Sequence, residues 1–268
     1  MLKLHCFGES GNAYKAALTL TLCGIDWEPV WVDFFHGASR TPEYRALNVM
    51  GEAPVLVDGD RVLTQSGVIQ LWAAETTGRF LAPREEALRW VFFDNHKVSS
   101  QAGALRFHMN FLPAEKRSPE VVDWLGGRLR SAFQVMEAQL SRSPWLAGDD
   151  PTIGDLACCG YLFYPEPFGF DRAGWPAIDA WLGRIAALPG WKHPYDLMPR
   201  RAGLSPTLPA PERTAPCPTP TSTTRSARPA ARASPTARCT RSPPCGSRRR
   251  CSTPCAVART CRPTRWRT

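Results

Sequence analysis

The spacing of apolar residues changes near residue 80, and this change limits the folds open to the chain. Leu2, Leu4 and Cys6 alternate with polar residues, which is typical of a strand with one buried face. From Glu85 onward the apolar residues repeat with a helical period, and few helix breakers intervene. The chain is therefore expected to fold as an α/β unit followed by an all-α unit.

The first unit, residues 1–80, has the element order of a small α/β sandwich. Gly24 marks the end of a helix, because glycine is a common helix stop. Asp58-Gly59-Asp60 separates two short apolar runs, as in a hairpin. The expected elements are a strand at residues 2–6, a helix at 13–23, a strand at 28–33, a hairpin at 54–63 and a helix at 66–75. This order is that of a thioredoxin-like domain.

The second unit, residues 85–204, is predicted to be all-helical, with residues 76–84 as the linker between the units. Thr152 stands three residues before Asp155, close to the capping-box arrangement that starts a helix. Three stripes of residues at helical spacing are expected to face the core: Leu88, Val91, Phe92, Asn95 and Val98; Val121, Val122, Leu125, Leu129, Ala132, Phe133, Met136 and Leu140; and Ile178, Trp181, Leu182, Ile185 and Leu188.

The formal charge of +9 belongs to the last 64 residues alone. Residues 1–204 hold 20 Lys and Arg against 23 Asp and Glu, a balance of −3. Residues 205–268 hold 13 Arg, no Lys and one acid, a balance of +12. The basic surface typical of a nucleic-acid-binding protein is thus confined to the tail, and no nucleic-acid partner is predicted.

The tail, residues 205–268, is predicted to be disordered, because Arg, Pro, Thr, Ala and Ser dominate it and large apolar side chains are few. A Lys-free stretch of this composition is also what a GC-rich gene gives when it is read out of frame. A frameshift-derived tail is therefore the favoured origin. An Arg-rich arm that binds nucleic acid and a disordered linker are the alternatives.

The cysteines of residues 1–204 indicate a reducing compartment. Cys6, Cys23, Cys158 and Cys159 form no C-x-x-C pair and have apolar neighbours, as buried thiols do. No stretch near the first residues resembles a signal peptide, and no run of about 18 apolar residues predicts a membrane span. A cytoplasmic protein without a membrane partner is expected. The histidines show no metal-ligand spacing, and no metal is predicted.

Three polar sites fall at one edge of the predicted sheet. Ala53-Pro54 opens the hairpin, and a cis proline there would turn the Ala53 backbone toward an extended peptide ligand. An ordinary proline at the start of a strand is the alternative. Gln65-Ser66 precedes a helix, where Ser66 is either a simple N-cap or part of an anion site.

Ser10-Gly11-Asn12 lies between the first strand and the first helix. Taken alone, Ser10 and Asn12 are favoured helix-capping residues. Their place at the same edge as Ala53 and Ser66 supports a second role, which is to hold an anionic group of a ligand at the positive end of the helix. Both interpretations stay open from the residues alone.

Four stretches in order resemble the glutathione S-transferase family: residues 9–18 (ESGNAYKAAL), 48–56 (NVMGEAPVL), 63–69 (LTQSGVI) and 151–157 (PTIGDLA). The resemblance runs through both predicted units and is strongest to bacterial members with Ser-Gly-Asn at the first helix. It implies a thioredoxin-like domain that binds glutathione as co-substrate, a helical domain that offers a pocket for a hydrophobic electrophile, and a homodimer. The implied reaction is attack of the glutathione thiolate on that electrophile.

The resemblance also assigns roles to single residues. Ser10, with Asn12 as the alternative, contacts the glutathione sulfur. The implied glutathione-binding residues are Ala53, Pro54, Gln65, Ser66 and Arg40. Arg40 would meet the glycyl carboxylate, although a solvated arginine is the simpler interpretation. The candidates for the electrophile pocket are Phe7, Gly8, Arg106, Phe107 and Phe111.

Two departures from the family pattern keep other functions open. Val49 stands where the family usually has proline, and Glu52 places a negative charge near an anionic tripeptide. One alternative is a disulfide reductase or peroxidase that depends on glutathione, which needs no protein cysteine when glutathione supplies the sulfur. The other is a binding protein that has kept the fold without turnover.

Overall fold

We describe the protein from a computed structural model, which places residues 1–200. The predicted disordered tail, residues 205–268, lies outside the described residues. Residues 1–200 belong to one compact unit in which a sheet-containing half precedes a helical half. No helix among residues 1–200 is both long and apolar enough to cross a bilayer.

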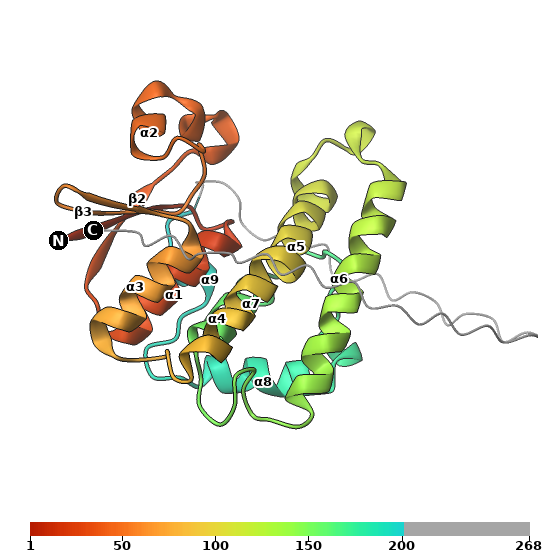
Figure 1. The fold of residues 1–268 in the computed structure, drawn as a ribbon. Coiled ribbons are helices and arrows are strands. Elements are labelled where there is room, and N and C mark those ends of the chain that lie inside the picture. Colours follow the sequence, from red (N-terminus) through yellow and green to blue (C-terminus); the bar gives the residue numbers. More distant parts are fainter. Residues whose placement is uncertain (201–268) are drawn as a thin grey trace, which may run out of the picture. The chain divides into compact units, whose positions relative to one another are not determined.

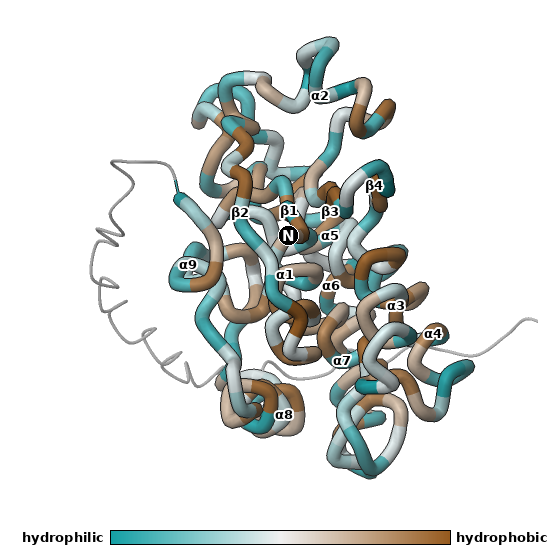
Figure 2. The backbone as a smooth tube through the Cα atoms, turned by 90° about the vertical axis from the view of Figure 1, so that its left-hand side faces the viewer, coloured by the Kyte–Doolittle hydropathy of each residue, from teal (hydrophilic) through white to brown (hydrophobic). Residues whose placement is uncertain are grey.

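The sheet has four strands in the order β2-β1-β3-β4. Their bounds are β1 Leu2–Cys6, β2 Trp27–Trp31, β3 Val55–Asp58 and β4 Arg61–Thr64. β1 runs parallel to β2, with Leu4 opposite Pro29, and antiparallel to β3, with Leu4 opposite Leu56. Figure 2 shows β1 between β2 and β3. The first strand and the hairpin are confirmed, whereas the second strand ends two residues before the predicted Asp33.

Three helices accompany this sheet: α1 Gly11–Cys23, α2 Pro42–Leu47 and α3 Ser66–Thr77. α1 and α3 pack together on one side of the sheet, and α2 lies on the other (Figure 1). α1 ends at Gly24, whose φ of 74° is the left-handed conformation that glycine adopts without strain. The predicted thioredoxin-like arrangement is therefore present.

The helical half begins at α4. Its helices are α4 Arg84–Phe93, α5 Ser99–Arg106, α6 Pro119–Leu140, α7 Ile153–Cys158, α8 Pro176–Ala186 and α9 Pro194–Leu197, with π turns at Asp94–Val98 and Phe107–Phe111. Short 3₁₀ turns occupy Phe34–His36, Ala38–Arg40, Ala114–Lys116 and Arg172–Gly174. α1 contacts α5, α7 and α9, so the two halves meet along α1.

The capping box predicted at Thr152 and Asp155 starts α7. The Asp155 Oδ2 atom accepts hydrogen bonds from the Thr152 backbone N–H at 2.8 Å and from the Thr152 hydroxyl at 3.1 Å. Its Oδ1 atom accepts from the backbone N–H of Leu146 and from the indole N–H of Trp181. Four donors therefore satisfy a carboxylate that is completely buried, and α7 is fixed at the centre of the helical half.

The predicted stripe on α4 is confirmed in part. Val91 and Val98 are buried and Leu88 packs against a buried cluster, but Phe92 is 70% exposed and Asn95 is also exposed. Trp90 and Asp94, which the stripe did not include, are buried. Asp94 is buried against α1, where it forms an ion pair with Lys15. The stripe on α6 is confirmed from Leu125 to Leu140.

Candidate active site

The start of α1 lies where the parallel strands β1 and β2 both end. Ser10 has extended backbone angles, and its Oγ atom accepts a hydrogen bond from the Ala13 backbone N–H at 3.1 Å. The capping prediction for Ser10 is thus confirmed. The cap uses only a lone pair of the hydroxyl, so its hydrogen is still available to an acceptor in front of the helix.

Contacts from the helical half hold the loop before α1. The Tyr164 hydroxyl donates to the Gly8 carbonyl at 2.6 Å, and the Arg106 guanidinium donates to the Glu9 carbonyl. A side chain on Gly11 would stand 2.7 Å from the Tyr161 ring, so only glycine fits between Ser10 and Asn12. The position of Ser10 therefore depends on both halves of the unit.

Ala53 presents an open backbone beside this loop. The Ala53-Pro54 peptide bond is cis, which decides between the two alternatives that the sequence left open. The Glu52 carbonyl accepts hydrogen bonds from the Tyr44 hydroxyl and the Asn48 amide, which fix the approach to β3. Within residues 1–200 the N–H and C=O groups of Ala53 make no hydrogen bond. Such groups are normally paired, so this backbone is suited to an extended ligand.

Gln65 and Ser66 form the third polar corner. Gln65 has a φ of 69°, which is uncommon for a residue with a side chain, and strain of this kind occurs often at functional sites. Its side-chain amide donates to the Glu52 carboxylate at 3.2 Å. Ser66 is the first residue of α3, with the free backbone N–H groups of the first helical turn around it.

A cavity of about 600 Å³ brings the first two corners and Gln65 together. Of the predicted site residues, it is lined by Phe7, Ser10, Asn12, Ala53, Gln65, Arg106, Phe107 and Phe111. An adjoining hollow of about 30 Å³ is lined in part by Pro54 and Ser66. Gly8 and Arg40 line neither one. Gly8 instead packs against Pro199 and Arg200, and Arg40 is exposed on a 3₁₀ turn, so their roles in ligand binding stay predictions.

One wall of the cavity is aromatic. The rings of Phe7 and Phe34 stack at a centroid distance of 4.8 Å, and the ring of Phe35 lies 5.0 Å from that of Phe111. Phe34 and Phe35 were not predicted as site residues, although their place just after β2, which is parallel to β1, was a usable signal. The other lining residues that were not predicted are Glu9, Met50, Glu52, Asn95, Ser99, Ser100, Gly103 and Tyr161, of which Glu52 was noted only as a departure from the family pattern.

Arg106 lines the cavity, but its charged group is bonded to other residues of the protein. The side chain is 2% exposed, and its guanidinium bonds to the Glu166 carboxylate at 2.7 Å and to the Tyr195 hydroxyl at 2.9 Å. Burial opposes ionisation of Glu166, but the attraction of Arg106 and the hydrogen bonds from Tyr195 and Arg106 together lower the pKa of its carboxyl. The positive charge of Arg106 is thus balanced within the protein, although the residue lines the cavity.

The other charged groups of the cavity are acids. Burial raises the pKa of the Glu9 carboxyl, and its Oε1 atom has no hydrogen-bond partner in residues 1–200. Glu52 borders the cavity from the opposite side. Among the residues that line it, Arg106 is the one cation, so the cavity offers an anionic ligand polar donors rather than a free positive charge.

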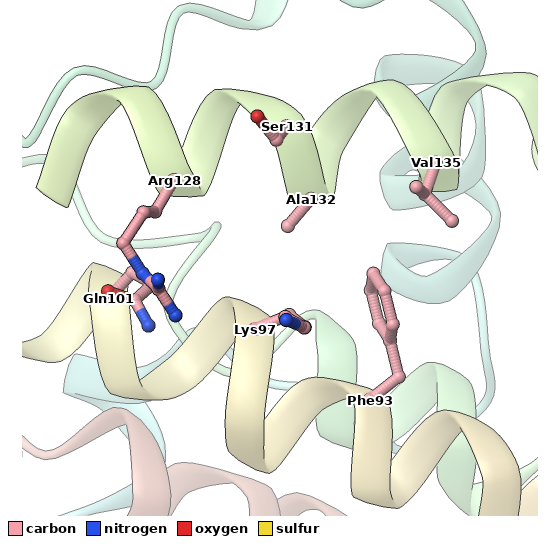
Figure 3. A pocket seen from close by; sticks show the side chains of 7 residues that line it. All are labelled: Phe93, Lys97, Gln101, Arg128, Ser131, Ala132 and Val135. Atoms are coloured by element: carbon pink, nitrogen blue, oxygen red, sulfur yellow. The ribbon is translucent and has the colours of Figure 1, made fainter. Parts of the chain in front are cut away.

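Two further features of residues 1–200 bear on the chemistry. A groove of about 320 Å³ lies between α6 and the segment from Phe93 to Gln101, with Arg128, Ala132 and Val135 on its α6 side (Figure 3). Its lining holds no carboxylate, thiol or imidazole. No group of three His, Cys, Asp or Glu side chains in the described part is arranged to hold a metal ion.

The thiols of the described part are buried and resist ionisation. Burial raises the pKa of Cys6 to about 12, and it also raises the pKa of Cys23. Burial raises the pKa values of Cys158 and Cys159 as well, and neighbouring carboxylates add to the shift. None of the four thiols in residues 1–200 is therefore suited to act as a thiolate nucleophile in this cavity.

Comparison with known proteins identifies the family. Residues 10–76 match the description "Glutathione S-transferase, N-terminal domain", and residues 101–189 match "Glutathione S-transferase, C-terminal domain". The chain is 32% identical to glutathione S-transferase 3 of Zea mays over 74% of its own length and 95% of that protein. It belongs to the glutathione S-transferase family of enzymes.

Two other relatives extend this picture. The disulfide-bond oxidoreductase YfcG of Escherichia coli is 29% identical over 70% of this chain and 92% of that protein. A crystal structure of a glutathione S-transferase from Pseudomonas fluorescens superposes with a TM-score of 0.68 at 34% identity, covering 73% of this chain and 99% of that one. The fold predicted from the sequence is confirmed.

The buried thiols lead to a labelling prediction. When the native full chain is treated with iodoacetamide at about pH 8, Cys6, Cys23, Cys158 and Cys159 should remain unmodified, because their thiolate populations and access are both low. Peptide mass mapping measures this residue by residue. The same treatment in denaturant should modify all four. Rapid modification of any of them in the native protein would contradict the assignment of these thiols as inert.

Proposed function

We propose that the protein is a glutathione transferase that ionises the glutathione thiol at the start of α1. The observation that carries the proposal is the convergence of Ser10, Asn12 and the open backbone of Ala53 on one cavity. The Ser10 hydroxyl and the Asn12 amide supply hydrogen-bond donors, and the helix adds its positive end. This is the arrangement that the Ser-Gly-Asn resemblance implies for the sulfur.

The hydrogen bonds and the helix dipole can lower the pKa of the glutathione thiol enough for catalysis at neutral pH. A free thiol titrates near pH 8.5, and lowering its pKa by about 2 units requires about 2.7 kcal/mol of preference for the thiolate. A hydrogen bond to a charged sulfur contributes roughly 1.5–3 kcal/mol, and a helix N-terminus adds about 0.3–1 kcal/mol. Two donors and the helix dipole therefore meet the requirement without a metal or a general base.

The rest of the site fits the tripeptide. The unpaired N–H and C=O of Ala53 match the backbone of an extended cysteinyl residue. Gln65 and the N-terminus of α3 at Ser66 suit the charged γ-glutamyl end. Glutathione supplies the sulfur nucleophile when it is bound, and the protein orients and desolvates it. Arg40 remains a prediction for the glycyl carboxylate.

The aromatic wall sets the class of electrophile. Phe35, Phe107 and Phe111 face the same cavity as the sulfur site, and such a surface favours flat apolar substrates. The predicted pocket between the first loop and the helical half is thus supported for Phe7, Phe107 and Phe111. In the proposed reaction a C–S bond forms and the leaving group departs with the bonding electrons.

Disulfide reduction with glutathione is the second candidate. It is favoured by the similarity to YfcG, which is named a disulfide-bond oxidoreductase. It also agrees with the inert thiols of the described part, because glutathione itself can attack a disulfide sulfur. Parallel assays with an activated aryl chloride and with a mixed disulfide of glutathione separate the two. A chain that binds glutathione but turns over neither substrate would be a binding protein.

A homodimer is also proposed, with α3 and α4 at its interface. Val68 on α3 and Phe92 on α4 are 48% and 70% exposed, and they border a common hollow of about 260 Å³. A large apolar side chain that is exposed beside an apolar hollow is a common mark of an interface. A reducing compartment, such as the cytoplasm, remains the predicted location.

Removal of either donor should slow turnover. We expect Ser10→Ala and Asn12→Ala each to lower kcat/KM with an activated aryl chloride by about 10- to 100-fold, the value of one hydrogen bond to a charged atom. Ser118→Ala is the matched control, since Ser118 caps α6 in the same way but lies away from the cavity. Full activity in both Ser10→Ala and Asn12→Ala would contradict the proposed mechanism.

Glu52 should weaken glutathione binding. Glu52→Gln keeps an oxygen acceptor for Gln65 and removes a negative charge beside an anionic ligand, so we expect about 3- to 10-fold tighter binding by calorimetry at low salt. Glu75→Gln, an exposed acid on α3 paired with Arg84, is the control and should change nothing. Weaker binding in Glu52→Gln would mean instead that this carboxylate receives the ligand's ammonium group.

The oligomeric state tests the proposed interface. Light scattering of the full chain should give the mass of two chains, and Phe92→Glu should shift the population to monomer by placing a charge in an apolar contact. Trp31→Glu, at an exposed aromatic on the outer strand β2, is the control and should leave the dimer intact. A monomeric wild type, or a Phe92→Glu dimer, would contradict this interface.

A further inference from the structure

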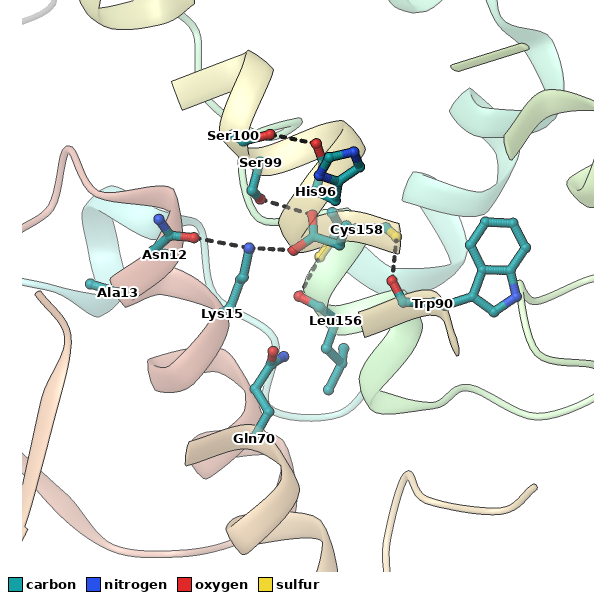
Figure 4. Close-up of polar contacts among 12 residues, drawn as sticks. Asn12, Ala13, Lys15, Gln70, Trp90, His96, Ser99, Ser100, Leu156 and Cys158 are labelled. Carbon is teal, nitrogen blue, oxygen red and sulfur yellow. Dashed lines mark hydrogen bonds and ion pairs between the residues drawn. The ribbon is translucent and has the colours of Figure 1, made fainter. Parts of the chain in front are cut away.

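A charged pair is buried directly beneath the start of α1. Lys15, one turn after Asn12, and Asp94, the first residue of the π turn, are both 1% exposed. Their side chains form an ion pair, and the Lys15 ammonium also donates to the Asn12 Oδ1 atom at 2.9 Å. Figure 4 shows the Lys15 side chain reaching back along α1 to Asn12.

The pair is held firmly on all sides. The second oxygen of Asp94 accepts a hydrogen bond from the Ser99 hydroxyl at 2.8 Å. A side chain on Gly160 would stand 2.7 Å from the Lys15 stem, so glycine is needed where the chain passes over it. The other titratable groups whose electrostatics involve the pair include Cys158, Cys159 and Tyr161, and burial raises the pKa of each, so all three are neutral. The ammonium therefore has little freedom to move.

Stability is a weak reason for such a pair. Two charges removed from water lose hydration that their mutual attraction often fails to repay, and apolar residues of similar volume can be equally stable. Burial indeed raises the pKa of the Asp94 carboxyl, against the opposing effect of Lys15. The hydrogen bond from Lys15 to Asn12 gives a better explanation of why the pair is present.

The chemistry of the ammonium fixes which way the Asn12 amide faces. An ammonium group has three donors and no acceptor, so Asn12 must turn its oxygen toward Lys15. Amide orientation is often ambiguous, but here the partner decides it. The amide nitrogen of Asn12 then points away from Lys15 (Figure 4), and Asn12 lines both the large cavity and the small hollow beside it. Asn12 can therefore offer the cavity only N–H donors.

We propose that the Lys15–Asp94 pair is a positioning device for Asn12, which locks the amide with its N–H groups toward the ligand sulfur. Lys15 is too deeply buried to touch the ligand, so it acts through Asn12. The ammonium also polarises the amide it bonds to, which strengthens the N–H donors on the far side. This inference rests on the proposed function only where it identifies the anionic atom as the sulfur of glutathione. The fixed orientation of the Asn12 amide does not depend on that function.

The first test removes the pair without leaving a buried charge alone. In the full-length variant Lys15→Met/Asp94→Leu we expect the thiol pKa of bound glutathione, followed by thiolate ultraviolet absorbance against pH, to rise by about one to two units. Binding of S-methylglutathione, which has no ionisable thiol, should change less than about threefold. Tyr14→Phe, which removes a polar contact from α1 to the Lys192 carbonyl and touches neither Lys15 nor Asn12, is the control and should leave the thiol pKa unchanged.

A double-mutant cycle shows whether the pair acts through Asn12. On an Asn12→Ala background, removal of the pair should produce no further rise in the thiol pKa. The same rise with and without Asn12, or no rise at all, would overturn the proposal. If the double variant does not fold, Lys15→Gln takes its place, since a glutamine can present either end of its amide to Asn12. It should give a smaller rise, and the absence of any rise would equally overturn the proposal.

A measurement on the ligand-free protein separates failure of this proposal from failure of the proposed function. Nitrogen-15 relaxation of the Asn12 side-chain amide should report a single ordered rotamer in the wild type and a loss of order once the pair is removed. An amide that stays equally ordered without the pair would overturn the positioning role. If glutathione does not bind the wild type, the proposed function fails, and the amide measurement still tests the lock.

Discussion

The burial of Lys15 and Arg106 between the sheet and the helices is the interaction on which the rest of the site depends. Arg106 reaches from the end of α5 to the Glu9 carbonyl, and Lys15 reaches from α1 to Asp94 at the end of α4. Each cation is neutralised by an acid of the helical half, Glu166 or Asp94. The start of α1 is therefore positioned by both halves, and neither half alone would hold Ser10 and Asn12 in place.

This arrangement explains the chemistry of the cavity. The charges of Lys15 and Arg106 are both paired with acids inside the protein. An anionic ligand in the cavity would therefore meet firmly positioned hydrogen-bond donors rather than a free positive charge. The Ser10 hydroxyl and the Asn12 amide each have one function satisfied by the protein, Ser10 as acceptor for Ala13 and Asn12 as acceptor for Lys15. What remains in both cases is a donor. The thiols of residues 1–200 are inert, which agrees with the proposal that glutathione supplies the nucleophilic sulfur.

Local signals in the sequence were sufficient for the sheet, the caps and the polar corners. Ser10, Pro54 and the Thr152 box were predicted from short patterns whose physics is local, and the structure has the cap, the cis bond and the box. What the sequence could not supply depends on contacts between distant segments. Asp94 is buried because it pairs with Lys15 of a distant segment, and Tyr161 lines the cavity because the two halves pack along α1.

The most direct test of the central claim is a crystal structure of the full chain with glutathione. The account predicts that the sulfur lies within hydrogen-bond distance of both the Ser10 hydroxyl and the Asn12 side-chain nitrogen, with the cysteinyl backbone paired to Ala53. Glutathione bound elsewhere, or bound in this cavity with its sulfur remote from both donors, would contradict the account.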